Sequence, residues 1–115
     1  MNYFDILVER KKQKDETVEN LKIYLDKIKE FLKQKFKDFR VILFGSYVKN
    51  QMNANSDIDI LIVIPQIGSV EEVHHLNFEI RKQIDFNQFI EIHIATEEEY
   101  NSWWSKFVKD NYIEY

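Results

Sequence analysis

The chain has 115 residues, of which 44% are apolar and 31% are charged, and its formal net charge is −4 at neutral pH. This length and apolar content are typical of one domain with a packed core, so we expect residues 1–115 to form a single domain. The negative charge gives no global basic field, and we therefore expect no direct binding to duplex nucleic acid.

The composition also limits the covalent chemistry and the location. The chain contains no cysteine, which excludes disulfide bonds and thiolate sites. Its apolar runs fall short of the about 20 residues that cross a membrane. Its first residues, MNYFDILVERKKQK, lack the pattern of a secretory signal. We therefore expect a cytoplasmic protein without membrane contact.

Two helices are predicted in a helical N-terminal segment, residues 3–37. Apolar residues at spacings of three and four predict a short first helix over residues 3–10, which the polar residues 11–14 either continue or link to the next helix. The second helix is expected to begin at Asp15 or Thr17 and to end near residue 37, because capping residues precede a long apolar stripe. That stripe consists of Val18, Leu21, Leu25, Ile28 and Leu32.

Two apolar runs with a polar segment between them predict the first two strands. Residues 41–44 form a continuous apolar run, as expected of a strand covered on both faces. Residues 46–51 predict a short helix, and residues 50–55 predict a polar turn. Residues 57–64 are rich in β-branched side chains and predict a second strand, which Pro65 ends.

A third helix and a third strand follow. Ser69 is a suitable N-cap for a helix whose apolar positions recur every three or four residues as far as Ile84. Residues 89–94 alternate between apolar and polar side chains, which predicts a strand. Because side chains alternate between the two faces of a strand, Glu91 and His93 are expected on the same face.

The last helix is predicted over about residues 96–109. Thr96 and Glu99 have the spacing of a capping box, in which each side chain accepts a hydrogen bond from the other residue's backbone amide. Trp103 and Trp104 are adjacent and cannot lie on one helix face. We expect one in the core and the other at the surface, as a partner contact or a platform for a base.

Helices and strands alternate along the chain around a central core over about residues 40–94. This order predicts an α/β (α+β) fold, in which a small mixed β-sheet is flanked by helices.

Two acids at the start of the second predicted strand form a candidate metal site. Asp57 and Asp59 are two residues apart, so a strand would place both carboxylates on one face. Two carboxylates this close repel each other, and a divalent cation such as magnesium removes the conflict. Glu91 is the candidate third acid, since an unpaired carboxylate in its apolar strand would be costly.

Gly45 and Ser46 form a candidate phosphate site between the two strands. A glycine lets the backbone approach a ligand closely, and amide groups at the start of a helix favour phosphate oxygens. The Ser46 hydroxyl is a further donor. A triphosphate that bridges this turn and a metal held by the acids is therefore physically reasonable.

The stretch GSYVKNQMNANSDIDILIV, residues 45–63, resembles the signature of the DNA polymerase beta-type nucleotidyltransferase superfamily, in its small form, the minimal nucleotidyltransferases. Glu91 matches the family's third carboxylate by position. The sequence departs from the pattern in two places: Asn50 stands near the position of a second glycine, and the third acid is Glu rather than the commoner Asp. Asparagine tolerates a left-handed conformation, so the turn is compatible with Asn50. The matching signature positions are Gly45, Ser46, Ser56, Asp57, Ile58 and Asp59.

The resemblance implies a polymerase beta-like nucleotidyltransferase fold and transfer of a nucleoside monophosphate, with ATP as the expected substrate and pyrophosphate as the product. It implies that Asp57 and Asp59 hold two magnesium ions, and that Glu91 shares one of them and acts on the attacking hydroxyl. Residues at the nucleotide would be Gly45, Ser46 and Ser56.

The resemblance also implies a partner. Similar minimal nucleotidyltransferases occur as antitoxins beside a HEPN-domain toxin and can transfer AMP to it, so we expect a HEPN-domain protein as the partner and acceptor. Two alternatives stay open: a binding module that neutralises such a partner by occlusion without catalysis, and a nucleotidyltransferase that acts on a small molecule. The latter lacks an acceptor domain unless a homo-oligomer supplies one.

Five other polar residues have candidate roles. His93 either assists metal or phosphate binding or is a hydrogen-bonded histidine of the sheet. Arg40 and Lys49 flank the central stretch and either neutralise phosphate or are ordinary exposed charges. His74 and His75 are expected at the surface, because no matching spacing of metal ligands accompanies them.

Overall fold

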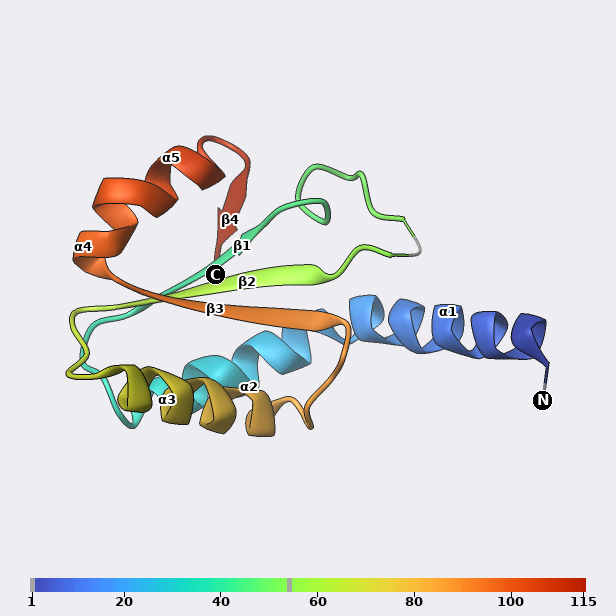
Figure 1. The fold of residues 1–115 in the computed structure, drawn as a ribbon, viewed down its shortest axis with the longest axis horizontal. Helices are drawn as coiled ribbons and strands as arrows, with labels where there is room; N and C mark the ends of the chain where they lie inside the picture. Colours follow the sequence, from blue (N-terminus) through green and yellow to red (C-terminus); the bar gives the residue numbers. More distant parts are fainter. Residues whose placement is uncertain (1, 54) are drawn as a thin grey trace.

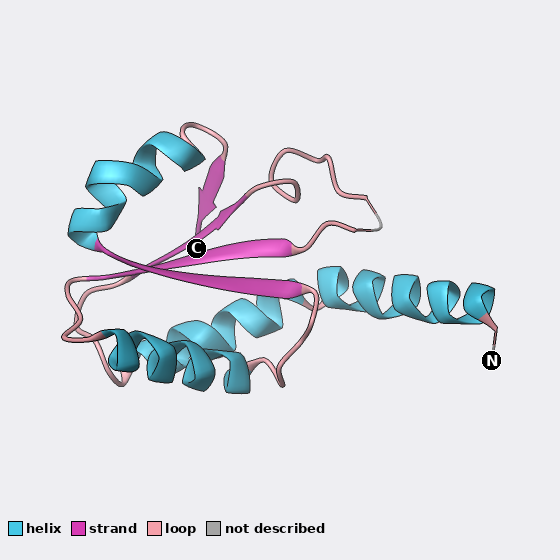
Figure 2. Ribbon diagram, viewed as in Figure 1, coloured by secondary structure: helices cyan, strands magenta, loops and turns pink. Residues whose placement is uncertain are grey.

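The computed structural model describes residues 2–53 and 55–115 and shows a four-stranded sheet between two layers of helices (Figures 1 and 2). The strand order is β3–β2–β1–β4. β1 pairs antiparallel with both β2 and β4, and β2 pairs parallel with β3. The predicted fold class, with a small mixed sheet, is confirmed. The strands are β1 (Arg40–Phe44), β2 (Ile58–Ile64), β3 (Ile90–Thr96) and β4 (Tyr112–Glu114).

The helices lie on both faces of the sheet. In the described part of the chain, no helix is long and apolar enough to span a membrane. Figure 1 shows α2 and α3 beneath the sheet and the C-terminal helical segment above it. The helical elements are α1 (Tyr3–Glu19), α2 (Leu21–Lys33), α3 (Val70–Gln83), α4 (Glu97–Glu99), the π-helix η1 (Tyr100–Trp104) and α5 (Ser105–Val108).

The alternation of side chains in the strands divides the core between the two faces of the sheet. Even-numbered residues of β2, such as Ile60 and Ile62, pack with α2 and α3 in the larger cluster. Odd-numbered residues, such as Leu61 and Val63, pack with Tyr100 and the C-terminal helices in the smaller cluster. Asp59 and His93 also lie on this second face, and His93 packs against Trp104 of the C-terminal helical segment.

The N-terminal helices differ from the prediction in their boundaries. Of the two alternatives for residues 11–14, continuation is confirmed: α1 runs from a capping box formed by Asn2 and Asp5 to Glu19. Good helix formers at residues 11–14 allow it to continue. The helix is interrupted at Asn20, where α1 ends and α2 begins, and α2 ends at Lys33. The N-terminal half of α1 projects beyond the sheet (Figure 1).

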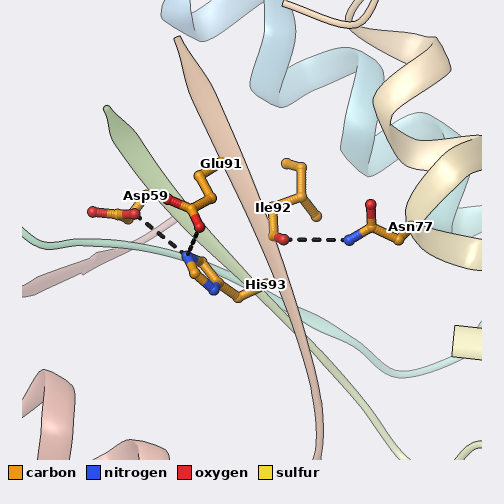
Figure 3. Close-up of polar contacts among 5 residues, drawn as sticks. All are labelled: Asp59, Asn77, Glu91, Ile92 and His93. Carbon is orange, nitrogen blue, oxygen red and sulfur yellow. Dashed lines mark hydrogen bonds and ion pairs between the residues drawn. The ribbon is translucent and has the colours of Figure 1, made fainter. Parts of the chain in front are cut away.

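The predicted third helix and strand are confirmed with small shifts. Ser69 caps α3, and its hydroxyl accepts a hydrogen bond from the Glu72 amide at 3.2 Å. β3 extends to Thr96, two residues beyond the predicted end. Asn77 on α3 donates to the Ile92 carbonyl at 3.3 Å, which fastens the helix to β3 (Figure 3).

The C-terminal helical segment begins as predicted, with the capping box of Thr96 and Glu99. Its π-helical turn was not predicted, because no single-sequence period indicates one. The two tryptophans divide as expected. Trp104 packs against the smaller core cluster, whereas Trp103 is 55% exposed.

β4 was missed by the sequence analysis. It has only three residues, all exposed, so it carries no clear alternation of apolar and polar side chains. Its pairing is supported by a contact at its end, where Glu114 and Arg40 form an ion pair at 2.6 Å. The strand covers the edge of β1 that β2 leaves free.

Candidate active site

Three polar side chains from the two parallel strands meet on the sheet face that carries the C-terminal helices. Asp59 on β2 is directly in register with Glu91 on β3, and His93 lies on the same face of β3. The Nε2 atom of His93 is 3.3 Å from Oδ1 of Asp59 and 3.8 Å from Oε1 of Glu91 (Figure 3). One ligand atom from each residue lies within 4.8 Å of the others, so the group has the size of a metal site.

The site opens to solvent on the side of Glu91. The side chain of Glu91 is 53% exposed, compared with 23% for Asp59 and 26% for His93. The expectation that Glu91 lies in an apolar environment was therefore wrong: its neighbours along the strand are apolar, but they point to the opposite face. The exposed carboxylate of Glu91 next to the half-buried carboxylate of Asp59 suits a site that receives a substrate.

Gly45 follows β1 and lies directly against the Asp59 carboxylate. Phe44, the last residue of β1, is in register with Asp59. Gly45 has a φ of +80°, and a Cβ atom at this position would lie 2.5 Å from Oδ2 of Asp59. Both the backbone conformation and the space therefore require glycine. The structure thus brings the predicted phosphate turn and one predicted metal ligand together.

The segment after Gly45 consists of turns, and the predicted short helix over residues 46–51 is wrong. The Lys49 amide donates to the Gly45 carbonyl at 3.2 Å, and the Gln51 amide donates to the Ser46 carbonyl at 2.8 Å. Asn50 has a φ of 56°, which ends any helical run. The expectation that Asn50 permits a left-handed turn is confirmed.

Asp57 and Ser56 lie in the loop just before β2. β2 begins at Ile58, so Asp57 is outside the strand, and it is not part of the group formed by Asp59, Glu91 and His93 in the described residues. The Ser56 hydroxyl accepts a hydrogen bond from the Asn53 amide at 3.1 Å and so helps to close the loop. Roles for Asp57 in metal binding and for Ser56 in nucleotide binding stay predictions.

A family model described as a nucleotidyltransferase domain matches residues 25–114, which contain all the strands and the site. The chain belongs to this family of nucleotidyltransferase domains. The match extends the resemblance of residues 45–63 to more than three quarters of the chain. It also includes Glu91, which the short signature alone does not reach.

Curated relatives of this nucleotidyltransferase domain come from Methanocaldococcus jannaschii and are provisionally named protein adenylyltransferases. One is 44% identical over 46 residues, which are 40% of this chain and 47% of the relative. Another is 37% identical over 57 residues, which are 50% of this chain and 56% of the relative. The chain thus aligns with about half of the length of these relatives.

One solved structure supports the same fold. A provisionally named nucleotidyltransferase from Sulfolobus solfataricus superposes on 91% of this chain and 84% of its own, with a TM-score of 0.57 and 19% identity. A toxin–antitoxin crystal structure with AMP-PNP superposes on 60% of this chain and 55% of its own, with a TM-score of 0.43 and 23% identity. The second likeness is too loose to inform the fold or the partner.

Lys14 on α1 supports the loop of this nucleotidyltransferase domain that carries Asp57, and the sequence analysis missed it. The residue is only 8% exposed, and its Nζ atom donates to the Asn53 carbonyl at 2.6 Å. Burial lowers the pKa of the Lys14 ammonium, and the negative charge of Asp57 partly opposes that shift. Helical spacing was the signal that could have indicated its burial. Lys14 lies three residues before Thr17 and four before Val18, so the three residues share one face of the helix.

We expect Lys14→Met to loosen this loop while leaving the fold intact. Methionine keeps most of the apolar stem but removes the donor to the Asn53 carbonyl, and it also removes a buried charge, so the free energy of unfolding should change by less than about 1 kcal/mol. The Ser56 amide, which donates to the same carbonyl at 3.1 Å, should exchange with solvent about tenfold faster. Hydrogen exchange followed by NMR measures this, with the exposed Lys12→Met as the control. Equal exchange in both variants contradicts the role of Lys14.

The remaining candidates lie away from the site or at the surface. Arg40 begins β1, whereas the site adjoins Phe44 at the other end of that strand, so the suggested phosphate role of Arg40 was wrong. Its guanidinium pairs with Glu114 and lies 4.4 Å from the centre of the Tyr100 ring. Lys49, in the turn after β1, is exposed. The last two, His74 and His75, are exposed on α3, as expected.

Proposed function

We propose that this chain is a magnesium-dependent nucleotidyltransferase that transfers AMP from ATP to a hydroxyl group of a partner protein. The observation that carries the proposal is the convergence of Gly45, Asp59 and Glu91, which three separate elements bring to one place. A glycine turn next to paired carboxylates can hold a phosphate chain beside cations. Membership of the nucleotidyltransferase family supports the reaction class.

The donor atoms of the site fit magnesium. Asp59 and Glu91 offer carboxylate oxygens, the ligands that this ion prefers, and we propose Asp57 as the further ligand from the adjoining loop. Two magnesium ions, when bound, would neutralise the charge of the triphosphate and of the departing pyrophosphate. The backbone of Gly45 and Ser46 would orient the β- and γ-phosphates, and Ser56 would contact the nucleotide.

The proposed reaction is an in-line displacement at the α-phosphorus. The acceptor oxygen forms a bond to that phosphorus, and the bond to the oxygen that bridges to the β-phosphate breaks. Pyrophosphate leaves with the electron pair, and the hydroxyl proton is released. Glu91 is the most exposed acid of the site, and it is therefore placed to orient the incoming hydroxyl and receive its proton.

Two observations support a protein as the acceptor. The relatives from Methanocaldococcus jannaschii carry the name of protein adenylyltransferases. In addition, the projecting half of α1 exposes apolar side chains that a partner would cover. From the resemblance to minimal nucleotidyltransferases we propose a HEPN-domain toxin as this partner, with the chain as its antitoxin. The exposed residues are Tyr3, Phe4, Ile6, Leu7 and Val8.

The test is incubation with magnesium, ATP labelled at the α-phosphate and the product of the neighbouring gene. We expect the label to appear on that protein, and to disappear when Asp57→Asn replaces the wild type. ATP labelled at the γ-phosphate serves as the control and should leave the acceptor unlabelled. Absence of transfer to the partner from the folded wild-type chain contradicts the proposal.

The same experiment addresses the binding module. The double variant Asp57→Ala/Asp59→Ala removes both acids of the signature but no core residue. If it binds and silences the partner as well as the wild type does, and neither protein transfers label, neutralisation occurs by occlusion. If only the wild type silences the partner, the partner is neutralised by the transfer of AMP.

A further inference from the structure

The proposed reaction gives no role to His93, although this side chain completes the group around Asp59 and Glu91. Its imidazole is 26% exposed and directs Nε2 toward both carboxylates (Figure 3). The ring also packs against Phe44 and Trp104, whose ring centres are each 5.4 Å away. A nitrogen donor is therefore fixed in place at a site whose other donors are oxygens.

The spacing of the three donors suits one ion. Metal–ligand bonds of about 2.0–2.2 Å place neighbouring ligands about 3.0–3.6 Å apart. The His93 nitrogen lies 3.3 Å from an Asp59 oxygen and 3.8 Å from a Glu91 oxygen. Small side-chain rotations suffice to bring all three to one cation, and Glu91 is exposed enough to rotate. The open side leaves room for water or a phosphate oxygen as the remaining ligands.

The donor types select the cation. Magnesium is a hard ion with a strong preference for oxygen. Imidazole suits Zn, Cu, Fe and Ni, whereas Mn²⁺ suits carboxylate and water but, as a transition metal, accepts a nitrogen ligand more readily than magnesium does. A group of two carboxylates and one imidazole therefore suits Mn²⁺. We propose that Asp59, Glu91 and His93 bind one transition-metal dication, with Mn²⁺ as the ion that takes the place of one of the two magnesium ions. The catalytic purpose of this ion rests on the proposed function, but its binding does not require a nucleotide or an acceptor.

A simpler explanation is that His93 only donates a hydrogen bond to Asp59. That arrangement also accounts for the 3.3 Å separation. The two explanations differ in the effect that His93 has on the relative affinities for Mn²⁺ and Mg²⁺. A hydrogen-bonded histidine adds nothing to the preference for Mn²⁺ over Mg²⁺ that the carboxylates have by themselves, whereas a nitrogen ligand raises the Mn²⁺ affinity selectively.

The test is metal titration of the nucleotide-free protein with Mn²⁺ and Mg²⁺ by calorimetry. We expect one Mn²⁺ per chain and an affinity for Mn²⁺ at least about tenfold above that for Mg²⁺. His93→Gln should lower the Mn²⁺ affinity by about tenfold or more and leave the Mg²⁺ affinity almost unchanged. His75→Gln, at an exposed position on α3, is the matched control and should bind both ions as the wild type does.

A second measurement reports on the ligand directly. The chain has three histidines, so imidazole nitrogen resonances can be assigned by substitution. Substoichiometric Mn²⁺ should broaden the His93 signals well before those of His74 and His75. Equal broadening of all three, or a Mn²⁺ affinity that His93→Gln leaves unchanged, overturns the inference.

These outcomes separate the inference from the proposed function. Selective Mn²⁺ binding at His93 in a chain that transfers no AMP supports the metal site and contradicts the proposed function. If the wild-type chain transfers AMP efficiently but His93→Gln binds Mn²⁺ as tightly as the wild type does, the proposed function is supported and the metal site is contradicted.

Discussion

Gly45→Ala should lower nucleotide transfer by about a hundredfold or more. The new Cβ atom would lie 2.5 Å from Oδ2 of Asp59, so either the carboxylate or the backbone must move. A displacement of about 1 Å at a catalytic group is enough for a loss of this size. The φ of +80° adds strain of about 1–3 kcal/mol in the folded state. Rates of AMP transfer and urea unfolding curves measure the two effects.

The second glycine of the chain supplies the control. A Cβ atom at Gly68 would meet Oε1 of Glu72 at 2.9 Å, and this is the far end of a flexible side chain that can move aside. Gly68→Ala should therefore leave transfer unchanged and cost little stability. Transfer by Gly45→Ala at the wild-type rate would show that the turn does not set the position of Asp59.

Asp59→Asn should lower the rate of transfer to about one thousandth of the wild-type rate or less. The amide keeps the shape of the carboxylate but loses its charge and its affinity for cations. The folded protein should tolerate the change. In the metal-free state Asp59 faces a second carboxylate, that of Glu91, and removal of one charge relieves their repulsion. We therefore expect an unchanged or slightly raised thermal midpoint together with the loss of activity.

The matched control is Asp38→Asn, at an exposed position before β1. It removes the same charge from the chain and should leave transfer intact. Two results contradict the role of Asp59: substantial transfer by Asp59→Asn, or an equal loss in both variants. A strongly lowered thermal midpoint in Asp59→Asn would instead indicate that the carboxylate stabilises the fold.

Local signals in the sequence predicted the central elements well. The apolar run of β1, the β-branched residues of β2 and the alternation in β3 each reflect a side-chain period that burial imposes. Ser69 and Thr96 mark helix starts because their hydroxyls satisfy backbone amides that have no partner within the helix. The sequence indicated Glu91 as the candidate third acid from a neighbouring strand, but its register with Asp59 is seen only in the structure.

The features that escaped prediction depend on contacts between distant parts of the chain. Lys14 is buried only because the loop before β2 folds against α1, and charge alone suggests an exposed residue. Asp57 shares a period with Asp59, but the strand begins one residue later than its pattern indicates. β4 is defined by its pairing with β1 rather than by its own composition.

The parallel pairing of β2 with β3 determines when the site can exist during folding. Parallel neighbours cannot be joined by a tight turn, so the chain must pass through the whole of α3 between Asp59 and Glu91. The two carboxylates therefore meet only after this long crossover has closed, a slow, non-local event. During synthesis, a chain that has not yet released β3 from the ribosome carries the glycine turn and Asp59 but no assembled site. Cation binding at these residues would consequently report completed folding and not the mere presence of the signature.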